Sequence, residues 1–320
     1  MRGKIYRQVY PNQNYCNNLE VASVKKGQVL GMRSQVFWII VSLLCVGIIV
    51  GSFLDFDISV TLSNKTTIGK FYETYGNMLT FLMYPVAAAC IYVGFKGKGE
   101  KFRFLSISSL IAGGFWAVYN LNGKYGKYIR SLLGYTPGDA GPFLPLALNY
   151  IIWIAVSCLV IVVITKLLDE SQADKLIAIG AVILIAALLG EAVNEWLKAV
   201  GCRPRYRYLV TLENPASEYK AWWQMIPYLA EESNFRSWPS GHMTDATIFL
   251  TLPMFGEVLK KRTSKTKYWL FGFAVIWILV MSYNRIHMQA HFLSDVCFGI
   301  LLTYFIYAFI YKAVFSVVKD

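Results

Sequence analysis

Charged residues are scarce in this chain. Only 16% of its 320 residues are charged, whereas 56% are hydrophobic. A soluble domain carries about 25% charged residues, so the composition argues against a water-soluble protein. Cysteine is limited to six scattered residues without a C-x-x-C pair. The sequence therefore indicates neither a disulfide framework nor a thiolate metal site.

Long apolar runs account for the missing charge. Each is close to the roughly 20 residues that a helix needs to cross a bilayer. A polar, basic segment precedes the first run, so that run is not the apolar core of a cleavable signal peptide. The expected fold class is all-α: a multi-pass transmembrane helical bundle of about eight spans. The predicted spans are roughly 34–54, 73–95, 104–120, 145–167, 176–198, 240–258, 268–285 and 291–314.

The net charge of +12 is concentrated in short stretches next to these spans. With eight spans, the clusters at 1–33, 96–103 and 259–267 all lie on one side, as the positive-inside rule requires of cytoplasmic segments. Omitting the short third span would put the cluster at 259–267 outside. We therefore expect both termini to be cytoplasmic. No groove for nucleic acid is needed to explain the charge, so nucleic acid is not an expected partner.

The predicted organisation has three parts. Residues 1–33 form a cytoplasmic basic N-terminal segment, 34–170 form N-terminal transmembrane helices that include additional spans, and 171–320 form the catalytic core helices. The longest outside loop, 201–239, carries three aromatic residues of the kind that favour the headgroup level. They are Trp222, Trp223 and Tyr228. We expect this loop to rest on the membrane surface.

The three histidines of the chain all lie at predicted membrane boundaries in its last third. His242 and His291 belong to two of three short polar segments that the eight-span topology brings to the same outer face. The first segment contains Lys198 and Arg205, the second contains Pro239, Ser240, Gly241 and His242, and the third contains Arg285, His291 and Asp295. The third histidine, His287, is interpreted as a boundary residue that fills a loop.

His291 and Asp295 are spaced to lie one turn apart on a helix. A carboxylate there can accept the proton of one imidazole nitrogen and leave the other nitrogen free as a nucleophile. By itself, the pair is better explained as a satisfied polar contact at a helix start.

The cations Lys198, Arg205 and Arg285 suit an oxyanion, because guanidinium forks match phosphate oxygens. The alternative interpretations are that they are snorkelling anchors or positive-inside charges, and their place on the outer side argues against the second. Ser240 and Gly241 open a helix whose first amides can bind an anion, and His242 beside them can protonate a leaving oxygen. The alternative there is a plain N-cap serine followed by a chance histidine.

Together, the three segments resemble the signature of the type 2 phosphatidic acid phosphatase superfamily. That signature reads Lys, six residues, Arg-Pro; then Pro-Ser-Gly-His; then Ser-Arg, five residues, His, three residues, Asp. The resemblance covers about 195–314. Tyr206 replaces the final Pro of the first motif, and Asn284 replaces the Ser of the third. Arg203 is followed by a proline but has the wrong spacing from Lys198, so Arg205 is assigned to the motif.

The resemblance implies a metal-independent membrane phosphatase without a cofactor. His291 would attack phosphorus, Asp295 would orient it, and His242 would protonate the leaving oxygen. The phosphate-binding residues would be Lys198, Arg205, Ser240, Gly241 and Arg285. We expect a lipid phosphate or diphosphate as substrate, such as phosphatidic acid or a polyprenyl diphosphate, at the non-cytoplasmic face of the cell membrane.

Two alternatives remain open at this stage. A phosphotransferase or a sugar-phosphate phosphatase would use the same site. A transporter would instead use Glu191, Glu195 and Asp245 as intramembrane ion ligands. In the phosphatase interpretation, Glu191 and Asn194 are partners of Lys198 or Arg205 and take no part in the reaction.

Overall fold

A computed structural model describes residues 27–132, 143–224 and 233–318 of the chain. Most of the basic N-terminal segment, with Cys16, lies outside these residues, as does Tyr228. The described residues are mostly helical and contain only two very short strands, which confirms the all-α prediction. The elements are β1 (Gln28–Val29), β2 (Met32–Arg33), α1 (Ser34–Leu62), α2 (Thr67–Phe81), α3 (Met83–Gly97), η1 (Glu100–Phe102), α4 (Arg103–Leu132), α5 (Phe143–Leu167), η2 (Glu170–Gln172), α6 (Ala173–Gly201), α7 (Tyr206–Leu209), η3 (Ser233–Phe235), α8 (Gly241–Ala246), η4 (Thr247–Glu257), α9 (Thr266–His287) and α10 (Leu293–Phe315).

Seven helical stretches among the described residues are long and apolar enough to cross a membrane. They are Ser34–Leu62, Thr67–Gly97, Glu100–Gly123, Ala147–Leu167, Glu170–Leu209, Thr266–His287 and Leu293–Phe315. The predicted count of eight is therefore not confirmed. The predicted sixth span, 240–258, consists of the short helix α8 and the 3-10 helix η4, and η4 contains Pro253. A proline cannot donate to the backbone ladder of an α-helix, so it interrupts a continuous α-helical span.

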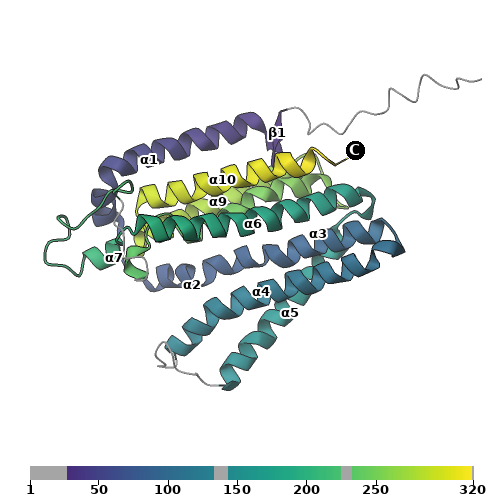
Figure 1. Cartoon of the computed structure of the whole chain (residues 1–320), viewed down its shortest axis with the longest axis horizontal. Helices are drawn as coiled ribbons and strands as arrows, with labels where there is room; N and C mark the ends of the chain where they lie inside the picture. Colours follow the sequence, from purple (N-terminus) through teal and green to yellow (C-terminus); the bar gives the residue numbers. More distant parts are fainter. Residues whose placement is uncertain (1–26, 133–142, 225–232, 319–320) are drawn as a thin grey trace, which may run out of the picture.

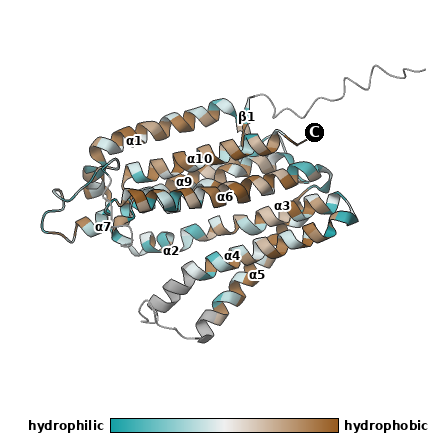
Figure 2. Ribbon diagram, in the orientation of Figure 1, coloured by the Kyte–Doolittle hydropathy of each residue, from teal (hydrophilic) through white to brown (hydrophobic). Residues whose placement is uncertain are grey.

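The long helices lie side by side in the order α1, α10, α6, α3, α4 and α5, and α9 packs on η4 beside α10 (Figure 1). The helices α4 and α5 diverge from the rest of the bundle (Figure 1). Hydrophobic residues run along most of the long helices, and hydrophilic residues gather at their ends (Figure 2). Many apolar side chains on the outside are exposed, for example Phe53 on α1 at 80%. This distribution fits a membrane protein.

Small residues let α3 and α6 approach closely. Ala87, Ala88 and Ala89 of α3 are fully buried. A Cβ atom added to Gly180 of α6 would lie 2.7 Å from the backbone oxygen of Ala87. Where lipid surrounds a bundle, such close approach supplies the van der Waals contact that holds helices together. These two helices therefore anchor the centre of the bundle.

A two-stranded hairpin, β1–β2, precedes α1 and was not predicted. Leu30 and Gly31 at its turn both have a positive φ, of 51° and 78°. The hairpin packs closely on η4. A Cβ atom added to Gly31 would lie only 2.9 Å from the backbone of Pro253. Both constraints favour glycine at position 31.

The loop after α7 holds one of its aromatic residues against the rest of the protein. Trp222 is half-buried, its ring stacks on Trp238 at 6.1 Å and its indole nitrogen donates to Ser52 at 3.0 Å. Trp223 is 51% exposed. The indole of Trp222 has an apolar body and one donor, and the stack on Trp238 and the Ser52 hydroxyl satisfy both.

Candidate active site

The three polar segments of the sequence meet at one end of the helix bundle. The C-terminal ends of α6 and α9 and the N-terminal ends of α8 and α10 supply them (Figure 1). The Nη1 atom of Arg203 lies 2.5 Å from Oδ1 of Asp295, which joins the first segment to the third. A Cβ atom on Gly241 would lie 2.6 Å from Nζ of Lys198, which joins the first segment to the second.

His291 is buried at the centre of this region, with 2% of its surface exposed. Its Nδ1 atom lies 2.6 Å from the backbone oxygen of Ser237. Because a carbonyl oxygen only accepts hydrogen bonds, Nδ1 carries the proton and donates it to Ser237. In the neutral ring Nε2 then has a free lone pair, which is the form that a nucleophilic imidazole needs.

The predicted direct hydrogen bond between Asp295 and His291 does not form. Its Oδ2 atom is 4.0 Å from Nδ1 of His291, too far for a hydrogen bond. Oδ2 instead accepts from the Ser237 hydroxyl at 2.6 Å and from the Phe292 amide at 2.9 Å. Asp295 is therefore connected to His291 through Ser237, and two closer donors occupy the carboxylate oxygen that faces the ring.

The electrostatic surroundings hold the pKa of His291 well below its ordinary value of 6.5. Burial is the largest cause, and the positive charges of Arg205, Arg285, His242 and Lys198 add to it. Burial disfavours the charged imidazolium, and nearby cations disfavour it further. Without a bound anion, His291 is therefore neutral at neutral pH.

Two of the cations around His291 have carboxylate partners. Lys198 lies 2.6 Å from Glu195, and Arg285 lies 3.2 Å from Glu73. Lys198 thus has an acidic partner in Glu195, one turn back on α6, whereas the sequence predicts Glu191. The predicted partner Asn194 does lie close by, with its amide 3.3 Å from the position of a Cβ atom on Gly241.

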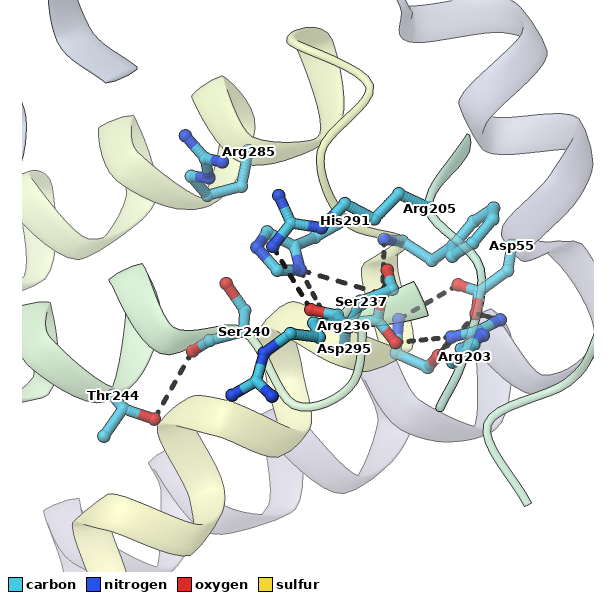
Figure 3. A network of polar contacts seen from close by, with 12 residues as sticks. Asp55, Arg203, Arg205, Arg236, Ser237, Ser240, Thr244, Arg285, His291 and Asp295 are labelled. Carbon is cyan, nitrogen blue, oxygen red and sulfur yellow. Dashed lines mark hydrogen bonds and ion pairs between the residues drawn. The ribbon is translucent and has the colours of Figure 1, made fainter. Parts of the chain in front are cut away.

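Buried donors in the site have no hydrogen-bond partner among the residues that the structure describes. Nε of Arg205 and the hydroxyl of Ser240 are two of them. Figure 3 shows His291 between Arg205 and Arg285, with the Ser240 hydroxyl directed toward the same region. Buried polar groups are normally satisfied, so such donors indicate a place where an acceptor binds. An anion with several oxygens suits them.

The two other histidines have different surroundings. Nε2 of His242 lies 3.3 Å from the backbone oxygen of Glu73, and the charge of His242 acts on His291. His242 therefore belongs to the site. His287 instead contacts the link between α1 and α2, with Nδ1 3.0 Å from the backbone oxygen of Leu62 and Nε2 3.3 Å from the Thr66 hydroxyl. These contacts agree with its interpretation as a boundary residue.

Sequence reasoning missed Glu73 and Arg207. Oε1 of Glu73 lies 3.2 Å from Arg285 and 3.6 Å from Arg207. Glu73 is on α2, far from the three motifs in sequence. Glu73 could have been identified from the sequence because it lies at the start of an apolar run. Charged residues in predicted membrane spans are functional candidates by default.

Arg203 does not face the region of the unpartnered donors. It is 1% exposed and places its guanidinium between Asp55 of α1 and Asp295 (Figure 3). Its guanidinium carbon also lies 4.2 Å from the centroid of the Phe292 ring. Arg203 is thus placed apart from the proposed phosphate ligands, as its spacing from Lys198 predicts. Its part in a buried ion network was not foreseen.

The acidic residues of the transporter alternative do not gather into an ion site within the described part of the chain. No group of three or more His, Cys, Asp or Glu side chains there is arranged to hold a metal ion. Glu195 is bonded to Lys198, and Asp245 accepts from the amide of Asn77 at 2.9 Å. The structure gives no support to that alternative.

Comparison with known proteins gives one match. No curated protein and no solved structure matches the chain. The matching segment begins within α6, ends after α10 and contains all three motifs. Residues 176–319 match the model of the PAP2 superfamily, whose members are generally phosphatases acting on phosphate esters, and this match confirms the resemblance read from the motifs.

Proposed function

We propose that this chain is a membrane phosphatase that hydrolyses a lipid phosphate or diphosphate through a phosphohistidine intermediate on His291. The observation that carries the proposal is a buried, neutral imidazole whose proton is fixed on Nδ1. Beside it lie the buried donors of Arg205 and Ser240, which have no partner among the described residues. A nucleophile and an anion-binding surface thus occur together.

The reaction would proceed in two steps. Nε2 of His291 attacks phosphorus, the bond to the ester oxygen breaks, and His242 gives a proton to the departing oxygen. His242 then takes a proton from water, which attacks the phosphohistidine and releases inorganic phosphate. Lys198, Arg205, Arg285 and Ser240 would stabilise the charge on the phosphoryl oxygens, which is the main contribution expected in phosphoryl transfer.

The position of the site supports a lipid substrate. The site lies where long apolar helices end, which is the depth of the phospholipid headgroups. A lipid phosphate can present its phosphate there while its chains stay in the hydrocarbon. The basic clusters of the sequence support the non-cytoplasmic side for this end, because they belong to the opposite ends of the spans.

The test is phosphate release by the purified protein in detergent and EDTA. The substrates are phosphatidic acid, a polyprenyl diphosphate and a soluble sugar phosphate, with His291→Gln and His287→Gln alongside. We expect wild type and His287→Gln to release phosphate from the lipids and His291→Gln to release none. A ³²P-labelled substrate should leave acid-labile, base-stable label on the wild-type protein.

Other outcomes would change the assignment. Activity that survives in His291→Gln would remove the proposed nucleophile. Release from the sugar phosphate alone would contradict a lipid substrate. Thin-layer analysis with and without an added acceptor lipid separates hydrolysis from transfer, since a transferase gives a new phosphorylated lipid only when the acceptor is present.

A further inference from the structure

A carboxylate outside the matched region reaches the centre of the site. Asp55 lies on α1 and is 1% exposed. Its Oδ2 atom is 2.9 Å from Nη2 of Arg203, and its Oδ1 atom accepts from the Ser294 amide at 2.9 Å. The Ser294 hydroxyl also donates to Oδ2. Since the superfamily match begins at residue 176, none of the motifs points to Asp55.

A continuous set of buried contacts connects Asp55 to the nucleophile. Arg203 bridges Asp55 and Asp295 through two nitrogens of one guanidinium. Asp295 accepts from the Ser237 hydroxyl at 2.6 Å, and the Ser237 carbonyl accepts from His291 at 2.6 Å. These groups are 0–2% exposed. Water therefore neither screens their charges nor takes the place of a lost hydrogen-bond partner.

The charges explain why Asp55 affects this arrangement. Arg203 is a single buried cation between two carboxylates. If Asp55 loses its charge, the guanidinium keeps Asp295 as its one ionic partner and is drawn toward it. A shift of Asp295 moves Ser237, because Ser237 is bonded to it, and therefore moves the carbonyl that orients His291.

Asp55 also caps the helix that carries Asp295. The Ser294 amide belongs to the first turn of α10, where backbone N–H groups lack partners within the helix. A carboxylate there is favoured by the helix dipole. Helix α1 approaches closely enough to supply it because residue 51 is glycine. A Cβ atom on Gly51 would lie 2.7 Å from Oδ1 of Asp55 and 2.8 Å from the Ser294 amide.

We infer that Asp55 is a positioning residue for His291, acting through Arg203 and Asp295. This inference rests on the proposed function, in which His291 is the nucleophile. It assigns to α1, a helix outside the matched region, a part in setting the reaction rate.

The test compares Asp55→Asn with Asp57→Asn. Asp57 lies on the same helix but is exposed, so the two variants make the same chemical change with and without the buried network. We expect Asp55→Asn to lower kcat about tenfold or more with little change in KM, because a small misplacement of a reacting group is costly. Asp57→Asn should match wild type. Asp55→Glu keeps the charge and should recover part of kcat.

Vanadate binding and thermal unfolding separate positioning from folding. Orthovanadate bonds to a well-oriented imidazole, so its affinity should fall in Asp55→Asn. A lower unfolding temperature with kcat and vanadate affinity unchanged would overturn the inference, as would a low kcat in Asp57→Asn. If Asp55→Asn does not fold, Asp55→Glu decides by the same comparison, and wild-type kcat and vanadate affinity in that folded variant would overturn the inference.

The same measurements distinguish failure of the proposed function. A wild-type protein that binds vanadate but releases phosphate from no substrate would contradict the phosphatase assignment. Vanadate affinity in Asp55→Asn would still report on His291. A fall would support the positioning role, and an unchanged affinity would refute it.

Discussion

The carboxylate of Glu73 lies 3.2 Å from the guanidinium of Arg285. Arg285 is 1% exposed and comes from the end of α9, whereas Glu73 comes from α2 in the N-terminal half of the chain. A negative charge thus already faces one of the cations assigned to phosphate. An anion that enters the site has to share Arg285 with Glu73 or displace it.

Removal of the Glu73 charge should tighten anion binding. In Glu73→Gln, we expect the affinity for inorganic phosphate or vanadate to rise several-fold, equivalent to about 1 kcal/mol. The gain stays well below the Coulomb energy of a buried pair because Glu73 is partly exposed. Competitive inhibition of phosphate release measures it, with the exposed Glu213→Gln as control. Weaker inhibition in Glu73→Gln would show that the carboxylate instead holds Arg285 in place.

The lowered pKa of His291 predicts activity at mildly acidic pH. A histidine with an ordinary pKa of 6.5 would be about three-quarters protonated at pH 6 and inactive in that fraction. In the folded protein the proton binds only at lower pH, so the acid limb of kcat/KM due to His291 should lie below pH 6.5.

A charge change tests the cause of that shift. Arg285→Gln removes one of the positive charges that lower the pKa of His291, so the pKa should rise and the acid limb should move to higher pH. The measured quantity is the pH at which the acid limb of kcat/KM falls. The plateau value of kcat/KM is not used, because it also reflects weaker substrate binding in the variant. Lys261→Gln changes an exposed charge and should leave the limb in place. If the acid limb does not move in Arg285→Gln, the group that titrates in this limb is not His291.

A methyl group at position 241 should affect activity much more than folding. In Gly241→Ala, the new Cβ atom would lie 2.6 Å from Nζ of Lys198, the mobile end of a long side chain. Lys198 can move away while the backbone stays, so we expect a thermal midpoint near wild type. Phosphate release should fall about tenfold or more because a cation leaves its place.

Gly114→Ala is the matched control for that substitution. A Cβ atom on Gly114 of α4 would meet nothing within 4 Å. Replacing a glycine inside a helix by alanine is favourable by about 0.5–1 kcal/mol, so this variant should be active and slightly more stable. Equal losses of activity in the two variants would contradict the close approach of Lys198 to residue 241.

The role of His242 predicts a dependence on the leaving group. His242→Asn should slow release from an alkyl phosphate by about 10²–10⁴-fold, since the alkoxide needs a proton. p-Nitrophenyl phosphate should suffer a smaller loss in the first step, because nitrophenolate leaves without protonation. Rapid-mixing measurement of the nitrophenolate burst checks this, with His287→Asn as control. Equal losses for both substrates would remove His242 as the general acid.

The sequence by itself determined the helical class and the residues of the three motifs. Apolar runs are a property of consecutive residues, so most predicted spans reappear as helices, such as α6 and α10. The spacing of His291 and Asp295 likewise follows from the chain alone. The predicted sixth span forms α8 and the 3-10 helix η4 instead of one continuous α-helix, because apolarity does not specify which backbone ladder forms.

Only the tertiary structure decided which groups surround the nucleophile. The hydrogen-bond partner of His291 is the backbone carbonyl of Ser237. Every residue has a backbone carbonyl, so the residue types in the sequence cannot predict which carbonyl is the partner. Asp55 and Glu73 reach the site from helices α1 and α2, which lie far from the motifs in sequence. Such contacts depend on how the helices pack against one another. Helix packing is a property of the whole bundle, so no single segment of the sequence determines it.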